Sequence, residues 1–310
     1  MQNKLITLVG GGGFLGRYTA QALLKAGARV RIAQRDPAGA LSLKPLAGLG
    51  QIQFVAADVR RPGTLEQAIS GSDAVVNLVG ILKGDFNAFH VEGGRNVATA
   101  AQLAGAGAFV QMSAIGADPQ SASSYGRSKG EGEGAVRAVF PSATILRPSI
   151  VFGREDQFVN RFAGMISAFP VVPVLRAAVR FQPVYVADVA AAVVAALADP
   201  QASGGRVYEL GGPDILSMGE LVRWIASATG RSPTIIEVPD AIGAMMARMG
   251  FLPGAPITWD QWLMLQSDNV VESGVAGLAA LGITPTPLVN VAPGWLVQYR
   301  RNGRFTTDAG

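Results

Sequence analysis

The feature that most constrains this chain is a short apolar run that leads directly into four consecutive glycines near the N-terminus. Leu5–Val9 is followed by Gly10–Gly13, then by Phe14, Leu15 and Gly16, and then by a helical pattern. This order is typical of a buried strand, a tight turn and the start of a helix. Glycine lets the backbone turn sharply and approach a ligand closely, and the free N–H groups at a helix N-terminus bind a pyrophosphate. The stretch therefore predicts a dinucleotide site in which Phe14 and Leu15 also contact the ligand.

Two glycine registers fit this loop. Gly11, Gly13 and Gly16 match G-x-G-x-x-G, the general dinucleotide fingerprint, whereas Gly10, Gly13 and Gly16 match the G-x-x-G-x-x-G spacing of short-chain dehydrogenase/reductases. No Gly-Lys-Ser/Thr follows, which excludes the phosphate loop of nucleoside triphosphatases. A flexible glycine-rich turn without a ligand is the alternative. The strand pattern before the loop and the helix pattern after it favour the nucleotide.

Composition restricts the other possible chemistries. The 310 residues are 49% hydrophobic and 15% charged, which is typical of a chain with a large core. The absence of cysteine excludes disulfides and thiolate metal sites, and a single histidine, His90, excludes a histidine-rich metal centre. The net charge of +4 suits a phosphate-bearing ligand or an anionic membrane face. With no cysteine and one histidine we expect no metal. Without a long basic run we expect no nucleic acid.

The expected location follows from the apolar segments. The five-residue run before the glycines is too short for the apolar region of a signal peptide, and no stretch approaches the length of a membrane span. We therefore expect a cytoplasmic protein.

Alternating strand and helix patterns predict an α/β fold, a doubly wound parallel Rossmann sheet with a smaller, less regular C-terminal domain. Capping-box spacing of Ser217 and Glu220 predicts a helix start in the smaller domain. The nucleotide domain is predicted to comprise residues 1–152 and 178–211, and the smaller domain 153–177 and 212–310. Strands are expected at residues 5–9, 29–33, 52–56, 74–78, 109–112, 143–146 and 207–210, and helices at about 89–103, 124–140 and 157–168.

Residues after the second strand indicate which nucleotide binds. An NAD-binding unit usually has an acid at the end of that strand, but here Arg35 precedes the first acid, Asp36. Arg35, together with Arg17 in the first turn of the first helix, suits the 2′-phosphate of NADP. Each arginine alone could be an exposed surface charge, and Asp36 could still reach a ribose. The sequence therefore favours NADP(H) over NAD(H).

The ends of the next two strands contribute further contacts. Asp58 and Val59 follow the third strand, where a carboxylate can accept a hydrogen bond from the adenine amine or cap a turn. Val79 and Gly80 end the fourth strand, where a small residue leaves room for the cofactor.

Tyr125 and Lys129 form the candidate catalytic pair. At i and i+4 they lie on one face of a helix. A nearby ammonium favours the phenolate, so we expect a lowered Tyr125 pKa and a role in proton transfer. Lys129 can also hold the nicotinamide ribose. Ser113, at the end of the fifth strand, is the candidate third member.

These residues together resemble the extended short-chain dehydrogenase/reductases: Gly10, Gly13 and Gly16, Asp58, Tyr125 and Lys129, with Pro148 in the loop that meets the nicotinamide amide. More specific motifs resemble one atypical branch, the family of the NADPH-carrying alpha-subcomplex subunit 9 of respiratory complex I. The likeness covers nearly the whole chain. These motifs are Phe-Gly-Arg-Glu-Asp at 152–156, Gln-Pro-Val-Tyr-Val at 182–186, Pro-Ile-Thr-Trp-Asp at 256–260 and Leu-Gly-Ile-Thr-Pro-Thr-Pro at 281–287.

The resemblance implies a reductase-like fold that holds NADPH as a structural part. It also implies complex I subunits as partners, at the cytoplasmic face of a bacterial inner membrane. A related branch is linked to ubiquinone biosynthesis, so an active NADPH-dependent oxidoreductase is the alternative, and a nucleotide sensor is a third. The chain departs from the active pattern at two positions. Ser113 is followed by Ala114 where those enzymes have a second hydroxyl, which could aim Ser113 away from a substrate. His90 replaces a frequent asparagine.

Four smaller predictions concern polar and aromatic residues elsewhere. We expect His90 to pair with a neighbouring backbone group or carboxylate, and the Glu155-Asp156 pair to be salt-linked to Arg154 or Arg161. Tryptophans and methionines after residue 240 suit either a domain core or a partner or membrane surface. Basic residues that could touch anionic lipid are Arg300, Arg301 and Arg304.

Overall fold

The computed structural model describes residues 1–252, 254–301 and 303, and the chain divides into two compact units. The sheet unit comprises Met1–Pro148, Val186–Leu210 and Glu272–Thr284. The second unit comprises Ser149–Tyr185, Gly211–Val271 and Pro285–Gly310, of which Arg304 and its neighbours lie outside the described residues.

A seven-stranded sheet organises the sheet unit, and all its neighbouring strands pair in parallel. The order β11-β6-β5-β4-β1-β2-β3 contains the 3-2-1-4-5-6 arrangement of a doubly wound dinucleotide-binding sheet, with β11 added at one edge. The predicted fold class is therefore confirmed. The strands are β1 (Leu5–Val9), β2 (Arg29–Gln34), β3 (Ile52–Ala56), β4 (Ala74–Asn77), β5 (Ala108–Met112), β6 (Thr144–Pro148) and β11 (Val207–Leu210).

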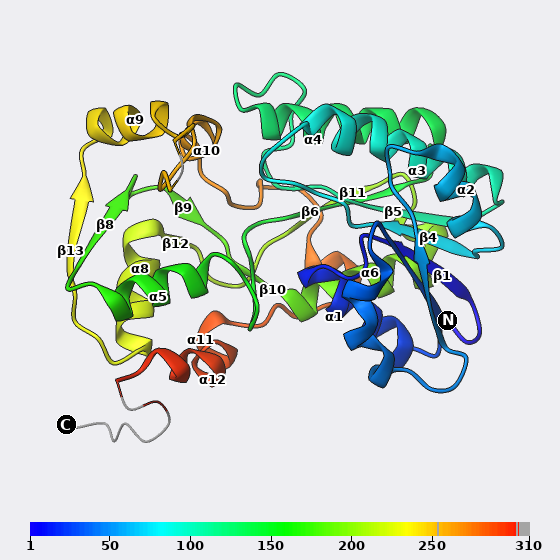
Figure 1. Ribbon diagram of the computed structural model, residues 1–310, viewed down its shortest axis with the longest axis horizontal. Helices are drawn as coiled ribbons and strands as arrows, with labels where there is room; N and C mark the ends of the chain where they lie inside the picture. The colour runs from blue at the N-terminus through cyan, green and yellow to red at the C-terminus, as the bar shows by residue number, and fades with distance from the viewer. Residues whose placement is uncertain (253, 302, 304–310) are drawn as a thin grey trace. The chain divides into compact units, whose positions relative to one another are not determined.

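Helices cover both faces of this sheet (Figure 1). One layer contains α1 (Phe14–Lys25) packed on α6 (Val186–Ala198), and the other contains α2 (Pro62–Ile69), α3 (Glu92–Leu103) and α4 (Ser124–Val139). With both faces covered, the strands are near-continuous apolar runs, as in other parallel sheets. Ile6, Leu8 and Ile32 have no exposed surface. The short helices α7 (Pro200–Ser203) and η3 (Leu278–Leu281) complete the unit.

Two irregular segments interrupt the sheet unit near the carboxyl ends of its strands. After β2 the chain forms a 3-10 helix, η1 (Pro37–Leu46), and after β4 it forms a single π turn, η2 (Asn87–Val91), that runs into α3. The sequence predicted one helix over 89–103, because the apolar spacing does not distinguish a π turn from an α-helical turn. Such turns are rare and often occur at functional sites.

The second unit has short strands and many connections. Its strands form three two-stranded sheets, and a separate core contains Phe152, Leu221 and Trp295. The predicted capping box is confirmed, since Ser217 and Glu220 cap α8 reciprocally. Its elements are β7 (Val151–Phe152), α5 (Val159–Ala168), β8 (Val171–Leu175), β9 (Arg180–Phe181), β10 (Val184–Tyr185), β12 (Leu216–Ser217), α8 (Met218–Ala228), β13 (Thr234–Val238), α9 (Asp240–Arg248), α10 (Trp259–Met264), α11 (Leu288–Val291), α12 (Pro293–Leu296) and η4 (Val297–Tyr299).

The units differ from the expected domains at several boundaries: residues 149–152 and residue 211, expected with the nucleotide domain, lie in the second unit, and two longer segments also change unit. Residues 178–185, expected with the nucleotide domain, lie in the second unit, where β9 pairs with β12 and β10 pairs with β7. Residues 272–284, expected in the smaller domain, lie in the sheet unit. The reason is a pair of hydrogen bonds to β11: the backbone N–H of Glu272 donates to the Glu209 carboxylate, and that of Glu209 donates to the carbonyl of Ala276.

Candidate functional site

A cavity of about 340 Å³ lies at the carboxyl ends of the central strands of the sheet unit, where ligands bind in doubly wound folds. The glycine loop forms one wall and the ends of β2, β3 and β4 form the others. Predicted cofactor residues that line it are Gly10, Gly13, Phe14, Leu15, Gly16, Arg35, Asp58, Val59, Val79 and Gly80. Arg17, Tyr125, Lys129 and Pro148 were also predicted and are not part of this lining.

The glycines of the loop are required for different reasons. Gly10 has a φ of +81°, which favours glycine, and a Cβ on Gly16 would lie 2.4 Å from the carbonyl oxygen of Gly11. A Cβ on Gly13 would meet only the carbonyl oxygen of Gly10, at 3.5 Å. Packing within the protein therefore accounts for Gly10 and Gly16 and not for Gly13, which faces the cavity. A close-approaching ligand is a physical reason for glycine at this position.

The N-terminus of α1 opens onto the same cavity. Gly13 is the N-cap of this helix, and no side chain caps the N–H groups of the first turn. Phe14, Leu15 and Gly16 of that turn line the cavity. Uncapped N–H groups and the positive end of a helix fit a pyrophosphate, so the residues present suit a dinucleotide.

Gln34 fixes the loop from the end of β2, and the sequence interpretation missed it. The backbone N–H of Gly12 donates to Gln34 Oε1 at 2.9 Å, and Gln34 Nε2 donates to the carbonyl of Asp36. The Asp36 carboxylate accepts from the N–H of Ala38 at 3.0 Å and caps η1. The side chains of Gln34 and Asp36 are thus both hydrogen-bonded to the backbone. Only their position beside Arg35 in the sequence could have indicated this role.

Two arginines lie over Phe89 at one end of the cavity, and one of them, Arg60, pairs with Asp58. Arg60 Nε and Nη2 donate to the two Asp58 oxygens at 3.0 and 2.6 Å. This hydrogen bonding lowers the pKa of Asp58 to about 2. The guanidinium carbons of Arg60 and Arg35 lie 4.9 and 5.8 Å from the centroid of the Phe89 ring. Arg17 instead donates from Nε to the carbonyl of Gly12 at 3.3 Å. Arg60 and Phe89 were not predicted.

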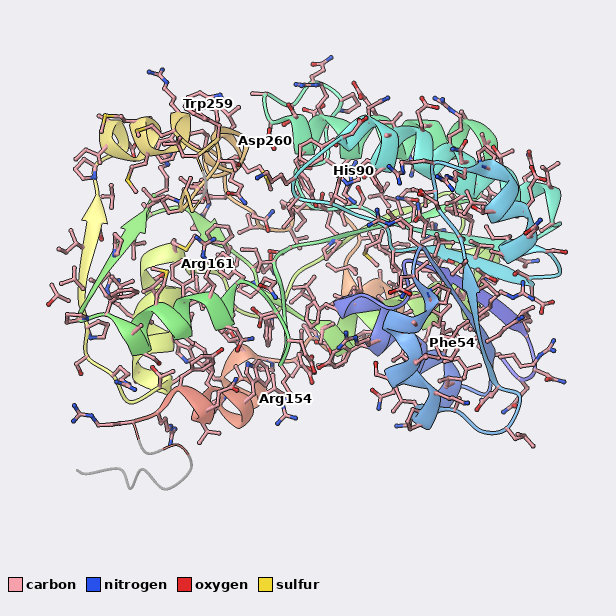
Figure 2. All side chains as sticks on the ribbon, viewed as in Figure 1. Phe54, His90, Arg154, Arg161, Trp259 and Asp260 are labelled. Atoms are coloured by element: carbon pink, nitrogen blue, oxygen red, sulfur yellow. The ribbon has the colours of Figure 1, made fainter. Side chains whose placement is uncertain are left out.

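His90 follows Phe89 in the π turn and lies beside α4 (Figure 2). Its Nε2 accepts from the backbone N–H of Ile81 at 3.0 Å, so the proton is on Nδ1, which lies 2.9 Å from Ser128 Oγ. Ser128 Oγ in turn donates to the carbonyl of Tyr125. Burial, with the Lys129 charge as a smaller cause, lowers the pKa of His90 to about 3. The predicted pairing with a backbone group is confirmed.

Tyr125 and Lys129 lie on one face of α4, but the electrostatics differ from the prediction. The Lys129 Nζ is 5.8 Å from the Tyr125 ring centroid and 3.2 Å from where a Cβ on Gly80 would be. Burial raises the pKa of Tyr125 to about 12 and lowers that of Lys129 to about 8. The expectation of a lowered Tyr125 pKa is therefore wrong, because desolvation of the phenolate outweighs the nearby ammonium.

Ser113 belongs to a buried ionic cluster. Its Oγ donates to Glu133 Oε1 at 2.5 Å, and Arg147 Nε and Nη2 donate to the same carboxylate at 2.8 and 2.7 Å. Arg147 also pairs with Glu209 at 3.6 Å. Glu133 is one helical turn beyond Lys129 and opposes the lowering of the Lys129 pKa. The Ser113 hydroxyl is thus held by a carboxylate, in line with the departure seen at Ser113-Ala114.

The predicted ion pair of Asp156 is wrong. This carboxylate is 3% exposed and accepts N–H groups from Gly153, Phe158 and Val159 at 2.6–3.1 Å. Burial raises its pKa, against the effect of these hydrogen bonds. Arg161 donates to the carbonyl of Pro256 instead. Asp156 therefore caps the start of α5, a role that the sequence pattern of neighbouring charges did not indicate.

Two features are absent from the described part of the chain. Across residues 1–252, 254–301 and 303 no group of three or more potential metal-binding side chains occurs. None of the helices in these residues combines the length and the apolar character needed to span a bilayer.

Known proteins match this geometry and sequence. The model of the NAD dependent epimerase/dehydratase family matches residues 6–211. The mouse protein NADH dehydrogenase (ubiquinone) 1 alpha subcomplex subunit 9, mitochondrial, is 36% identical over 293 residues, which cover 91% of this chain and 77% of that protein. The chain belongs to the NAD dependent epimerase/dehydratase family, in the branch of subunit 9.

Two further proteins are similar to this family member. The ceramide reductase of Caulobacter vibrioides is 31% identical over 261 residues, 81% of this chain and 80% of that protein. An NADPH-dependent quinone oxidoreductase from Escherichia coli, solved in complex with NADPH, is 21% identical and covers 94% of this chain and 99% of its own, with a TM-score of 0.75. The structural likeness shows the shared fold.

Proposed function

We propose that this chain is an accessory or assembly subunit of respiratory complex I that holds NADP(H) mainly as a structural part. The 36% identity to subunit 9 across 91% of the chain supports the association with complex I. One observation carries the structural role of the nucleotide: a complete glycine-loop cavity lies beside a tyrosine whose pKa is raised to about 12. A phenol that stays protonated, with Ser113 held by Glu133, is poorly suited to proton transfer.

We propose one direction for the nucleotide in the cavity. In this proposal the pyrophosphate binds the first turn of α1, and the adenosine end reaches Asp58 and Arg35. The nicotinamide ribose is held by Tyr125 and Lys129, with Pro148 near the amide. When bound, the cofactor supplies a hydride-carrying nicotinamide. NADP(H) is favoured over NAD(H) because Arg35 follows β2 and the Asp36 carboxylate caps η1.

Peripheral contact with the cytoplasmic face of the inner membrane is part of the proposal. Helices α9 and α10 of the second unit carry exposed apolar side chains, and Arg248 lies 5.4 Å from the Trp259 ring. Trp259 is labelled in Figure 2. Apolar and aromatic groups beside a cation suit a membrane interface. The exposed side chains of this surface are Ile242 at 46%, Met245 at 58%, Met249 at 50%, Phe251 at 81%, Leu252 at 43% and Trp259 at 40%.

Affinity purification with native mass spectrometry tests the proposed function. The tagged chain is isolated from gently solubilised membranes of the source cells and analysed without denaturation. We expect bound NADP(H) and respiratory subunits in the same complexes. Gly13→Val is the matched control, because it fills the cavity wall where packing leaves room and should abolish nucleotide retention. Wild-type protein that carries neither nucleotide nor respiratory subunits would contradict the proposal.

An active NADPH-dependent oxidoreductase linked to ubiquinone biosynthesis is the second candidate. Retention of Tyr125 with Lys129 on α4, and the 31% identity to a ceramide reductase, favour it. General acid catalysis is worth roughly 10²–10⁴-fold in rate. For a structural nucleotide we expect Tyr125→Phe to change NADPH oxidation less than about threefold, far below that range. NADPH oxidation with a soluble quinone, and cellular quinone content, are measured against Tyr18→Phe. A hundredfold loss specific to Tyr125→Phe would establish the enzyme instead.

A further inference from the structure

Gln182, the first residue of the Gln-Pro-Val-Tyr-Val motif, joins three separate segments of the second unit. Its Nε2 donates to the carbonyl of Gly212 at 2.8 Å, and its Oε1 accepts from the backbone N–H of Val271 at 3.0 Å. The backbone N–H of Gln182 lies 3.1 Å from the carbonyl oxygen of Asn269 and 3.3 Å from Ser149 Oγ. Ser149 Oγ in turn lies 2.7 Å from Asn269 Oδ1. These five residues form the Gln182 cluster.

The Gln182 cluster gathers the places where the chain passes from one unit to the other. The chain crosses between the units after residues 148, 185, 210, 271 and 284. Ser149, Gly212 and Val271 lie at three of these crossings, and Gln182 shortly precedes a fourth. At the crossing after residue 271, the N–H of Val271 donates to Gln182, and the next N–H, of Glu272, donates to the Glu209 carboxylate at 2.9 Å. Consecutive residues are thus fixed within the two units.

The two glycines after β11 are required by this cluster. A Cβ on Gly211 would lie 2.4 Å from Gln182 Cδ, and a Cβ on Gly212 would lie 2.0 Å from the carbonyl oxygen of Pro183. A larger residue at either position would displace Gln182 or Pro183, because a packed interior has no room for an added atom at such distances. The crossing after residue 210 is therefore closely packed as well as hydrogen-bonded.

We propose that the Gln182 cluster makes the second unit unfold together with the sheet unit, so that a nucleotide bound in the sheet unit also stabilises the second unit. Parts of a chain unfold as one when the interactions that fasten them are lost together. A ligand that binds only the folded state then lowers the unfolding constant of everything that unfolds with its site. The inference rests on the proposed nucleotide binding and states what a structural nucleotide does: it stabilises the unit that carries α9 and α10.

Urea denaturation followed by tryptophan fluorescence tests this coupling, because all four tryptophans of the sequence lie in the second unit. They are Trp224, Trp259, Trp262 and Trp295. NADP⁺ is added to the full chain at about 100 times the dissociation constant that calorimetry gives for each variant, which lowers the unfolding constant of a coupled unit about 100-fold. We expect this protection in the wild type and less than about threefold protection in Gln182→Leu. Gln266→Leu is the matched control and should keep full protection, since Gln266 is an exposed glutamine of the same unit whose side chain donates to the carbonyl of Trp262.

Two results would overturn the inference: full protection in Gln182→Leu, or a wild type that binds NADP⁺ without protection of the tryptophan signal. Ser149→Ala is the milder variant should Gln182→Leu fail to fold, and it is expected to lower the protection about fivefold, the value of one hydrogen bond. Unchanged protection in Ser149→Ala would also contradict the inference. Wild-type protein that binds no nucleotide by calorimetry would instead refute the proposed function, so the two failures are distinguishable.

Discussion

The two ends of the candidate site, the Phe89 end of the cavity and the Tyr125–Lys129 end beside the cavity-lining Gly80, stabilise charge in opposite ways. Around Phe89 the charges are in contact with water: the side chains of Asp58 and Arg60 are 13% and 45% exposed. Around Tyr125 the charges are buried, since Lys129 and Glu133 are each 6% exposed. At the first end the carboxylate keeps a lowered pKa, and at the second the tyrosine pKa rises and the lysine pKa falls. Hydrogen bonding thus favours the charged form of Asp58 at the first end, whereas burial opposes the charged forms of both Tyr125 and Lys129 at the second.

This contrast follows from the balance between desolvation and pairing. A charge at the surface keeps most of its hydration, so a partner lowers its energy further at little cost. A charge in the interior has lost its hydration and is stable only when fully paired, as in the Ser113–Glu133–Arg147 cluster. Removing one partner should therefore have unequal consequences at the two ends.

The largest expected effect is on stability, from Glu133→Gln. The change removes the charged partner of Arg147 and leaves it with Glu209 at 3.6 Å, while the amide oxygen of glutamine can still accept from Ser113. We expect a loss of about 3 kcal/mol in the free energy of unfolding, typical of a broken buried pair. Arg60→Ala at the exposed end should cost at most about 1 kcal/mol. Urea denaturation of both variants at neutral pH measures the difference. Equal losses would remove the distinction between the two ends.

A smaller effect concerns pH, through His90. Because its pKa of about 3 in the folded protein lies below the ordinary 6.5, the unfolded chain binds more protons between these values. The free energy of unfolding therefore decreases as pH falls from 6.5 toward 3. His90→Asn removes this proton uptake. We expect the free energy of unfolding of the wild type to fall by about 2 kcal/mol more than that of His90→Asn between pH 7 and pH 4.5.

Urea denaturation at the two pH values measures this difference. Arg60→Ala is the control from the exposed end, because the Asp58 pKa of about 2 lies below this window. The difference in unfolding free energy between Arg60→Ala and the wild type should change little between the two pH values. If the difference between His90→Asn and the wild type stays constant, the imidazole is not held neutral by burial, and the contrast between the two ends is weaker than the structure indicates.

The sequence predicted the framework of the site well. Five of its features were local: an apolar strand, a glycine run, a helix start, and the strand ends that carry Asp58 and Gly80. The period of the apolar residues and the spacing of the glycines determine such features within a few residues. The bounds of β1 and β3 were therefore predicted as observed. The parallel sheet then brought the strand ends to one edge without further information.

What the sequence did not predict depends on tertiary contacts. Phe89 reaches Arg35 and Arg60 only because a π turn precedes α3, and the apolar spacing does not specify that turn. The direction of the Tyr125 pKa shift depends on how deeply the ring is buried. The spacing of Tyr125 and Lys129 in the sequence does not reveal that burial. Asp156 was assigned to an arginine from proximity in sequence, although its partners are backbone amides.

The smallest expected effect is the uptake of a fraction of a proton by Lys129 when NADPH binds. With a pKa of about 8, Lys129 is half protonated at pH 8. A bound pyrophosphate nearby favours the ammonium and raises this pKa, so binding of NADPH should take up about half a proton at most. The 2′-phosphate does not contribute, since its second pKa of about 6 leaves it ionised at pH 8.

Calorimetry of NADPH binding in two buffers of different ionisation enthalpy measures the uptake, because the buffer supplies the proton and its heat. Lys129→Met should reduce the uptake to zero, whereas Arg60→Ala, at the exposed end, should leave it unchanged. Uptake that persists in Lys129→Met would assign the proton to another group. Uptake that disappears in Arg60→Ala would mean that the two ends of the candidate site do not titrate independently.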